Sequence, residues 1–518
     1  MISFNDQLPP TFNVARYFVE KNVDSGAGAK VAFYHQDQTL TYEQVYRSVR
    51  QTAGLIQDLG VDREHRVAIL LPDSPELVFT FWGAVWAGCV AVPINTSCAV
   101  DEVRHILADC RARLLVTTEL WYERLTPLRL PLLRQILRVD GRPDLLELLG
   151  RAPAELSAAD TCRDEPAFWL YTSGSTGRPK GVVHAHCGMV VCAELYAKRT
   201  LGLGADDINY STAKIPFAYG LGSTLYMPSA VGGSAVLTEA GNAFDIIADI
   251  HRYRPTILWG TPAVYAGLLA LSEIAPLDVS SIRLCVSAAE RLPEPIWHSF
   301  RRSYGLEICE GAGATEALHI FLSNRPGTCR PGTAGLPVPG YQVRTVGPGG
   351  RSLPPGHTGE LEVAGESLML GYWALQRESQ AVLHGGALRT GDRCVADAEG
   401  FFRLLGRTDE RFKVGGLWVA PAEVEDTLRG HPDVLDCAVV PECPDPRGLP
   451  AVAAYIEPKP GHGPADALAE DVRRFAMGRL PRIKVPRVVR LIEALPRTAT
   501  GKVDRKRLQR LDVSGRKQ

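Results

Sequence analysis

A run rich in glycine, hydroxyl and basic side chains follows the apolar stretch AFWLY. It reads YTSGSTGRPKGVV over residues 171–183. Glycines let backbone N–H groups approach an anion, hydroxyls add hydrogen-bond donors, and lysine adds positive charge. The run therefore predicts a phosphate-binding loop, although it lacks the GxxxxGK[ST] order of a Walker A motif. The residues concerned are Thr172, Ser173, Gly174, Ser175, Thr176, Gly177, Lys180 and Gly181. A flexible linker, the competing interpretation, gives no reason for proline, lysine and glycine in register after a buried strand.

Four further motifs follow the loop in chain order. They are GATE at residues 313–316, TGD at 390–392, GRTD at 406–409 running on to KVGG at 413–416, and PRTATGK at 496–502. With the glycine-rich loop, this ordered set resembles the motifs of the adenylate-forming superfamily. That superfamily includes acyl-CoA ligases, peptide-synthetase adenylation domains and luciferases. The resemblance covers essentially the whole chain.

The resemblance implies that a carboxylate attacks the α-phosphate of ATP. The attack brings like charges together, so the site needs cations and oriented donors where charge accumulates. Lys502 then bridges the carboxylate and the α-phosphate, Glu316 holds Mg²⁺ and Thr315 contacts phosphate, with Thr176 and Lys180 also catalytic. A carboxylate accepts both hydroxyls of a ribose, which suits Asp392, and Arg407 donates to the same sugar. The resemblance adds Ala289, Glu290, Glu310 and Gly311 to the nucleotide site.

A second half-reaction with CoA is also implied. In the family, the C-terminal domain swings so that a second face serves thioester formation, which places the pivot at Asp409. Gly415, Gly416 and Trp418 then line a narrow tunnel for pantetheine, where a Cβ on either glycine would obstruct access. A tight hairpin turn is the alternative interpretation of the two glycines, and it stays open for Gly416.

Two segments, KIPFAYGLG at residues 214–222 and EALHIFLSN at 316–324, resemble the benzoate-CoA and anthranilate-CoA ligase branch. An aromatic wall opposed by small residues suits a flat ring, although Phe217, Tyr219 and Ile320 also fit an ordinary core. The departures AGA at 312–314 and SAAE at 287–290 leave the ring substituents open. The implied acid pocket comprises Phe217, Ala218, Tyr219, Gly220, Ala288, Gly311, Ala312, Gly313, His319 and Ile320.

His319 follows Glu316 by three positions, so a helix would place both on one face. We expect His319 to form a hydrogen bond with the acid's carboxylate or an ortho substituent, because no second histidine completes an HExxH-type metal site. A satisfied core histidine is the alternative. His184 and His186, after the glycine-rich loop, are expected to be structural or weakly adjacent to ATP rather than catalytic.

These residues need elements that position them. Short β-rich runs at residues 31–35, 66–70, 113–118, 255–260 and 282–288 alternate with amphipathic segments such as 41–59, which favours an α/β fold with largely parallel sheets. Shorter strands and turns after residue 340 predict a more antiparallel, barrel-like piece. We therefore expect an N-terminal adenylation domain over 1–406, comprising two α/β subdomains and a distorted β-barrel at about 340–405. A small, mobile α+β domain with the lysine follows over 407–518.

Composition excludes several classes of protein. Lys plus Arg number 57 and Asp plus Glu 58, so a net charge of −1 gives no reason to expect nucleic acid or an anionic membrane. The 12 cysteines contain no CxxC pair, and no early apolar segment predicts a secretory signal, so a cytoplasmic protein is expected. Residues 77–94 carry no charge, but Gly88 and Pro93 interrupt them. They predict a buried helix over about 75–87 and a buried strand rather than a membrane span.

Three functions compete. The first is an ATP-, Mg²⁺- and CoA-dependent ligase of a benzoate-type acid, without distinction between benzoate, hydroxybenzoates and aminobenzoates. The second is a stand-alone adenylation enzyme that loads an aryl group onto a carrier protein. The third is a catalytically silent nucleotide-binding protein, which the intact Lys502, Glu316, Asp392 and Lys180 disfavour. Pathway and oligomeric state are not indicated.

Overall fold

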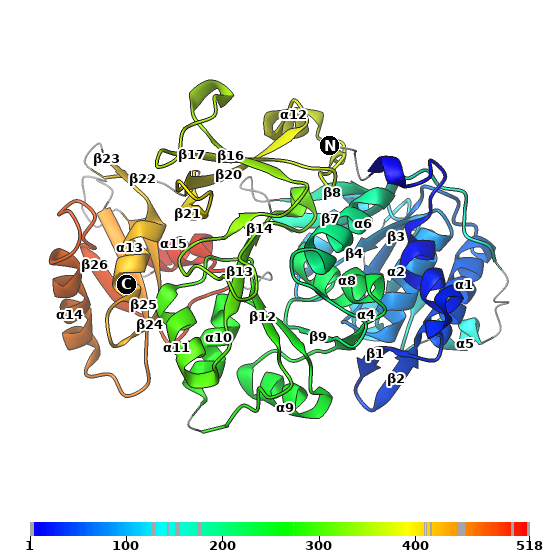
Figure 1. Cartoon of the computed structure of the whole chain (residues 1–518), viewed down its shortest axis with the longest axis horizontal. Coiled ribbons are helices and arrows are strands. Elements are labelled where there is room, and N and C mark those ends of the chain that lie inside the picture. The colour runs from blue at the N-terminus through cyan, green and yellow to red at the C-terminus, as the bar shows by residue number, and fades with distance from the viewer. Residues whose placement is uncertain are drawn as a thin grey trace. The chain divides into compact units, whose positions relative to one another are not determined.

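The chain forms two compact units that interleave along the sequence. The first comprises Met1–Leu292, His298–Val343 and Glu362–Arg389, and the second comprises Pro293–Trp297, Arg344–Leu361 and Thr390–Gln518 (Figure 1). The sequence-based boundary at residue 406 stays a prediction. The computed structural model describes residues 5–125, 130–141, 145–150, 156–173, 178–272, 274–408, 410, 412–414, 417–442, 451–498 and 502–514.

A nine-stranded sheet forms one part of the first unit. Its strands from β1 through β10, β9, β11 and β12 to β13 pair in parallel, while β2, β14 and β15 add antiparallel edges. The carboxyl ends of the parallel strands therefore meet at one edge, where α/β proteins commonly bind ligands. The order is β15 (Leu336–Pro337), β14 (Ile320–Ser323), β13 (Ile308–Gly313), β12 (Leu284–Ser287), β11 (Ile257–Gly260), β9 (Ile208–Ser211), β10 (Ser234–Leu237), β1 (Val31–His35) and β2 (Gln38–Thr41).

A seven-stranded sheet forms the other part of the first unit. Strands β7, β4, β3, β5 and β6 pair in parallel, and β8 and β18 extend the sheet by antiparallel pairing. The α/β architecture expected from the alternating runs is confirmed. The order is β18 (Gly371–Tyr372), β8 (Pro179–Ala185), β7 (Pro166–Ser173), β4 (Val90–Pro93), β3 (Arg66–Leu70), β5 (Leu114–Thr117) and β6 (Gln135–Arg138).

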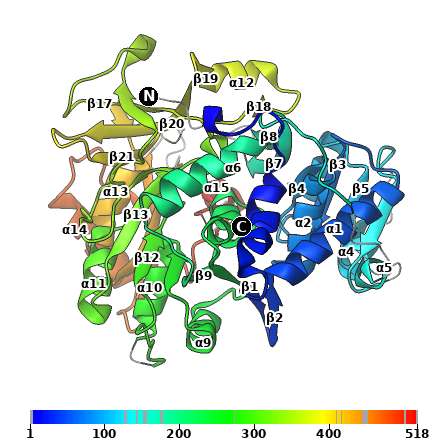
Figure 2. The same ribbon diagram turned by 45° about the vertical axis from the view of Figure 1, so that its right-hand side comes forward.

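The uncharged run folds into helix α2 (Pro75–Trp86) and strand β4, as predicted. Ser74 caps the helix, Pro75 starts it, and Gly88 adopts φ +76° just after its end. All residues of α2 except Glu76 are buried, and α1 (Tyr42–Asp58) runs beside it (Figure 2). A Cβ on Gly83 would lie 2.7 Å from Thr52, so glycine permits this close approach. No described helix is long and apolar enough to cross a membrane.

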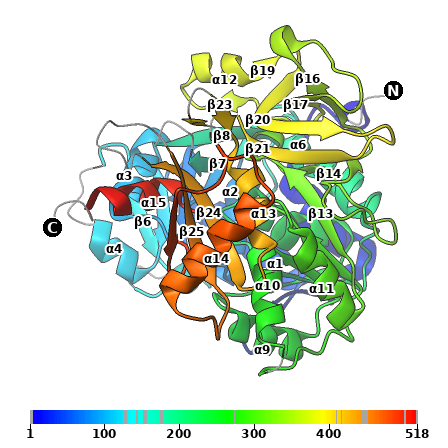
Figure 3. The same ribbon diagram turned by 90° about the vertical axis from the view of Figure 1, so that its left-hand side faces the viewer.

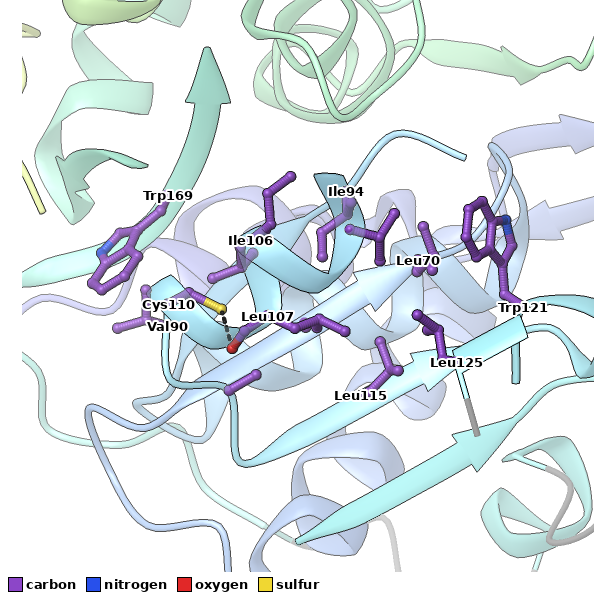
Figure 4. Close-up of a cluster of buried hydrophobic side chains, with 14 of the residues drawn as sticks. Leu70, Val90, Ile94, Ile106, Leu107, Cys110, Leu115, Trp121, Leu125 and Trp169 are labelled. Carbon is purple, nitrogen blue, oxygen red and sulfur yellow. Dashed lines mark hydrogen bonds between the residues drawn. The ribbon is translucent and has the colours of Figure 1, made fainter. Parts of the chain in front are cut away.

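A hydrophobic cluster covers one face of the seven-stranded sheet beneath α3 (Val100–Asp109) and α4 (Glu119–Leu125) (Figure 4). Leu70, Val90 and Leu115 from the strands are buried against Ile106 and Leu107 from α3. Complete burial of each such aliphatic side chain contributes about 1.5–3 kcal/mol. This packing fixes the strands whose ends carry the polar residues described below.

The second unit contains β21 (Phe402–Arg407) and the part of its antiparallel partner β20 (Ala387–Ala396) that follows Arg389. It also contains the sheet of β24 (Val434–Glu442), β25 (Ala451–Pro458) and β26 (Val488–Leu491). Alternate residues of β24 pack on opposite faces. Cys437 and Val439 join the cluster beneath α13 (Pro421–Arg429) and α14 (Ala465–Met477), while Ala438 and Val440 join that of α15 (Arg505–Ser514) (Figure 3). The expected small α+β region is thus observed, with β22 (Phe412–Val414) and β23 (Leu417–Val419) forming a hairpin before it.

Candidate active site

Strands β7 and β8 form the two stems of the glycine-rich loop. Thr172 pairs with Lys180 and Ser173 with Pro179 in the antiparallel ladder. His105 of α3 anchors the second stem, since its Nε2 lies 3.2 Å from the Pro179 carbonyl oxygen. The ladder therefore places Thr172 and Lys180 side by side at the base of the predicted phosphate loop. The side chain of Ser173 and all of Gly174, Ser175, Thr176 and Gly177 lie outside the described parts of the structure.

Tyr372 links two of the predicted residues. Its hydroxyl donates a 2.7 Å hydrogen bond to Glu316 Oε1, and Lys180 Nζ lies 5.3 Å from the centre of its ring. Glu316 and Thr315 belong to the short turn η6 (Thr315–Ala317) after β13. A cation and a carboxylate from distant parts of the sequence thus meet around one phenol. Tyr372 was not among the residues predicted for the site, and no local pattern around it indicates this role.

His184 supports the same turn from β8. Its Nε2 lies 2.8 Å from the carbonyl oxygen of Thr315, and its ring stacks on Phe168. Burial lowers the His184 pKa to about 4, so the ring is neutral at neutral pH and Nε2 donates. His186 is also buried, and its Nδ1 accepts the backbone N–H of Val14. Both histidines have the structural role expected of them.

Tyr219 lies over the carboxyl ends of two parallel strands. It belongs to α7 (Ala218–Gly220), and its hydroxyl lies 3.2 Å from the Gly260 carbonyl oxygen and 3.1 Å from that of Val286. Burial raises its pKa well above the ordinary value, so the phenol stays protonated as a donor. These bonds fix the aromatic wall predicted for the acid pocket.

His319 packs directly against Tyr219. Its Nε2 lies 3.3 Å from the Tyr219 carbonyl oxygen, and the two ring centres lie 5.8 Å apart. Burial lowers the His319 pKa to about 4, so Nε2 is the donor and Nδ1 is an acceptor. This Nδ1 is buried and has no partner among the described residues. No group of three metal-ligating side chains occurs in the described chain, and Glu316 and His319 have separate partners.

Glycines let the other predicted pocket segments approach one another. A Cβ on Gly311 would lie 2.9 Å from Ile320, and one on Gly313 would lie 2.6 Å from the His319 carbonyl oxygen. A Cβ on Gly220 would lie 2.1 Å from the carbonyl oxygen of Lys214. Ala288 and Ala312 are buried at the ends of β12 and β13, and Phe217 and Ala218 are half-buried.

The remaining residues predicted for the nucleotide follow the same two strands. Glu310 of β13 is buried, and its Oε1 accepts the Leu292 N–H at 3.0 Å. Ala289 is exposed and has φ +75°, a conformation that costs free energy for any residue with a Cβ. Glu290 is half-buried beside it. Glu310, Ala289 and Glu290 therefore lie at the same edge of the nine-stranded sheet as Tyr219, whereas Thr172 and Lys180 belong to the seven-stranded sheet.

Asp73 is a polar residue that the sequence analysis missed. It is buried after β3, and its Oδ1 accepts the Ile215 N–H at 3.0 Å. Burial raises the Asp73 pKa to about 7, while the nearby Lys214 charge opposes that shift. Lys214 Nζ in turn donates to the Thr238 carbonyl oxygen at 2.6 Å. The sequence did contain a signal for Asp73, since it is a charged residue between a buried strand and an apolar helix.

The second unit carries the other predicted residues. Asp392 and Arg407 are direct partners in the β20–β21 ladder, with Oδ1 and Nη1 3.7 Å apart. Arg407 Nη1 also donates to the Thr390 carbonyl oxygen at 2.8 Å. A carboxylate and a guanidinium therefore lie together, and their contact with a ribose stays a prediction. Asp409, Gly415 and Gly416 lie outside the described residues, as does the side chain of Trp418.

Lys502 is exposed in a narrow turn before α15. The Thr498 N–H donates to the Lys502 carbonyl oxygen at 2.7 Å, and the Asp504 N–H donates to Pro496 at 2.7 Å. Arg497 binds Asp436 of β24 at 2.8 Å, and Arg505 binds the buried Glu425 of α13 at 2.7 Å. Ion pairs thus hold both ends of the turn.

Comparison with known proteins places this geometry in a family. A family model of AMP-binding enzymes matches residues 19–373, and one of the AMP-binding enzyme C-terminal domain matches residues 423–502. The chain is 36% identical to a 4-hydroxybenzoate–CoA/benzoate–CoA ligase of Rhodopseudomonas palustris, over 97% of this chain and 95% of that protein. It is 35% identical to an anthranilate–CoA ligase of Pseudomonas aeruginosa, over 92% and 93%.

A solved structure gives the same result. The crystal structure of the anthranilate CoA ligase AuaEII in complex with anthranoyl-AMP matches with a TM-score of 0.93 and 36% identity, covering 98% of this chain and 99% of that one. The resemblance predicted from the ordered motifs is confirmed. The chain belongs to the adenylate-forming family of AMP-binding enzymes, in its benzoate-CoA ligase-like branch.

Proposed function

We propose that the protein is an AMP-forming acid–thiol ligase that converts a benzoate-type acid to its CoA thioester. The observation that carries the proposal is the contact of Tyr219 with His319 beside the turn that bears Glu316. It puts an aromatic wall and a neutral histidine next to the residues that resemble a nucleotide site. Relatives named as benzoate-, hydroxybenzoate- and anthranilate–CoA ligases support the same acid class.

In the proposed first half-reaction, a carboxylate oxygen of the acid attacks the α-phosphorus of ATP. The new P–O bond forms as the bond to pyrophosphate breaks, which gives acyl-AMP. Lys180 and Lys502 supply positive charge, the glycine-rich loop supplies donors through Thr172, Ser173, Gly174, Ser175, Thr176 and Gly177, and Asp392 and Arg407 hold the ribose. Thr315, Ala289, Glu290, Glu310 and Gly311 complete the nucleotide site.

Mg²⁺ is the cation that this donor set fits. Mg²⁺ is commonly held by one or two carboxylates together with substrate phosphates, so the lone Glu316 suffices on the protein side. When bound, the ion would neutralise charge on the phosphates. Tyr372 fixes one oxygen of Glu316 through its 2.7 Å hydrogen bond, which orients the carboxylate.

In the proposed second half-reaction, the CoA thiol attacks the acyl carbon. A C–S bond forms, the bond to the AMP oxygen breaks, and the thiol proton is released. We assign the pivot between the two half-reactions to Asp409 at the start of the domain 407–518. Gly415, Gly416 and Trp418 would line the pantetheine tunnel. A cytoplasmic location stays a prediction.

The acid would lie against Tyr219, with the small side chains of Ala218, Ala288, Gly311 and Ala312 leaving room for a flat ring. His319 Nδ1 is an acceptor without a partner among the described residues. It therefore favours a donor on the acid, such as a hydroxyl or amino substituent. The other proposed pocket residues are Phe217, Gly220, Gly313 and Ile320.

The proposal is tested by supplying ATP, Mg²⁺, CoA and an acid panel to the purified protein. Acyl-CoA formation from one or more benzoic acids supports it. The same reaction tests the alternative in which the aryl group is loaded onto a carrier protein. Release of pyrophosphate without acyl-CoA would favour that alternative.

A further inference from the structure

Residues 367–373 form a strap that crosses beside the Glu316 turn and β8. The strap ends in β18, where Gly371 pairs with Val183 and Tyr372 with Val182. The Trp373 N–H also donates to the Gly181 carbonyl oxygen at 2.8 Å. The C-terminal end of the strap is therefore fixed on β8, the strand that carries Lys180.

The strap also binds every residue of the η6 turn except Thr315. Ser367 Oγ donates to the Ala317 carbonyl oxygen at 2.7 Å, and the Met369 N–H donates to that of Glu316 at 2.8 Å. His184 of β8 supplies the bond to Thr315. The turn needs this support because Leu318, which follows it, has φ +69° although it carries a side chain.

Tyr372 is the strap residue that reaches the Glu316 side chain. Its hydroxyl binds Oε1, while Oε2 has no hydrogen-bond partner among the described residues. Its ring meanwhile faces Lys180 Nζ at 5.3 Å. A hydrogen bond to an ionised carboxylate restricts its rotation and is stronger than one between neutral groups. One carboxylate oxygen is thus fixed while the other remains for a ligand.

We propose that Tyr372 is a positioning residue that presents Glu316 Oε2 to the divalent cation of the bound nucleotide. The proposal rests on the function proposed for Glu316. Tyr372 does not contact the reacting atoms in this account. It acts by holding Oε1 of the carboxylate, so that no orientation of Glu316 has to be selected when the nucleotide binds.

Tyr372→Phe tests the proposal because it removes the hydroxyl and keeps the ring over Lys180. We expect the gain in ATP affinity caused by Mg²⁺, measured by equilibrium titration with and without the ion, to fall roughly tenfold. AMP affinity and thioester formation from preformed acyl-AMP should stay within about twofold of wild type. Tyr17→Phe is the matched control. The Tyr17 hydroxyl also donates to a glutamate, Glu194, with a 2.5 Å hydrogen bond, but this pair lies elsewhere in the fold.

The variants Glu316→Gln and Glu316→Gln/Tyr372→Phe separate the possible failures. If Glu316→Gln leaves the Mg²⁺ dependence unchanged, the role proposed for Glu316 is wrong. If Glu316→Gln reduces the dependence and Tyr372→Phe does not, the positioning role is wrong. Additive losses in the double variant, or an equal loss of AMP affinity, would also overturn it, because they would show that Tyr372 acts independently of Glu316.

Discussion

Asp73 and Ile215 join the two sheets of the first unit at the edge that carries the predicted acid pocket. The buried carboxylate accepts the Ile215 N–H at 3.0 Å with Oδ1 and at 3.4 Å with Oδ2. Ile215 lies in the segment that leads to Tyr219, and Asp73 follows β3. The hydrogen bond therefore ties the segment before Tyr219 to the end of β3. Asp73 therefore has a definable part in shaping the pocket.

We predict that Asp73→Ala raises the KM for the aryl acid more than Asp73→Asn does. Alanine leaves the buried Ile215 N–H without its acceptor, which costs about 1–3 kcal/mol, whereas the asparagine oxygen still accepts. Steady-state kinetics with ATP and CoA saturating give the comparison. Equal KM values for the two variants would show that the bond does not shape the pocket.

Asp73 also predicts a pH dependence of stability. Its pKa is raised to about 7, above the value in the unfolded chain, so folding favours the protonated form. This stabilisation is complete at low pH and is lost as the pH rises from about 4 through 7. The melting temperature of Asp73→Asn relative to wild type should therefore increase between pH 5 and pH 8. A constant difference would contradict the raised pKa.

The buried histidines predict the opposite trend in acid. Burial lowers the pKa values of His184, His186 and His319 to about 4. Histidines in the unfolded chain are protonated below about pH 6.5. The free energy of unfolding therefore decreases as the pH falls from 6.5 toward 4, by up to about 3 kcal/mol for each histidine. Between pH 7 and pH 5, the melting temperature of His186→Asn should decrease less than that of the wild type. An identical loss would indicate that His186 is not held neutral.

Lys502→Ala should separate the two half-reactions. Removing a cation needed for attack on the α-phosphate lowers adenylation at least about 100-fold. Transfer from preformed acyl-AMP to CoA should stay near the wild-type rate, because that step forms no bond to phosphorus. Stopped-flow or radiolabel assays of each step give the ratio. Equal losses in both steps would contradict the assignment of Lys502 to adenylation alone.

Arg505→Met should disturb the same step through the Lys502 turn. The variant leaves the buried carboxylate of Glu425 without the partner that holds the turn at α15. Arg490→Met is the matched control, since Arg490 pairs with the buried Glu442 at 2.5 and 2.8 Å on another strand. We expect similar losses of melting temperature, but about tenfold slower adenylation only in Arg505→Met. Equal adenylation rates would show that the pair serves stability alone.

Ala218→Phe tests the wall of the acid pocket. The larger side chain adds bulk beside Tyr219, so the KM for aryl acids should rise while ATP binding is unchanged. A methyl-sized change in an apolar pocket alters discrimination between substrates by about 1–3 kcal/mol. The phenyl group added in Ala218→Phe is larger than a methyl group. Unchanged aryl-acid kinetics would mean that Ala218 does not line the pocket.

Local signals in the sequence were sufficient to predict individual helices and strands. Helix α2 and strand β4 were predictable because Pro75 and Gly88 mark the helix ends and the β-branched run follows. The ordered motifs likewise indicated the family. The glycine-rich run predicted a phosphate-binding loop after one strand, whereas the antiparallel pairing that places Thr172 beside Lys180 is seen only in the structure.

Contacts between distant segments were not predictable in the same way. The bonds of Asp73 to Ile215 and of Tyr372 to Glu316 depend on how separate strands and turns pack, and no spacing in the sequence encodes them. The neutral state of His319 likewise follows from burial among aromatic rings contributed by several elements. Such properties require the tertiary structure.

The proposed function is tested most directly by measuring pyrophosphate and acyl-CoA in one reaction. The reaction is supplied with ATP, Mg²⁺, CoA and a panel of acids. The panel contains benzoic, hydroxybenzoic, aminobenzoic, cinnamic and medium-chain fatty acids. We expect equal amounts of pyrophosphate and acyl-CoA from at least one benzoic acid, with hydroxy- or aminobenzoates preferred. Activity on fatty acids alone, or pyrophosphate release without acyl-CoA, would contradict it.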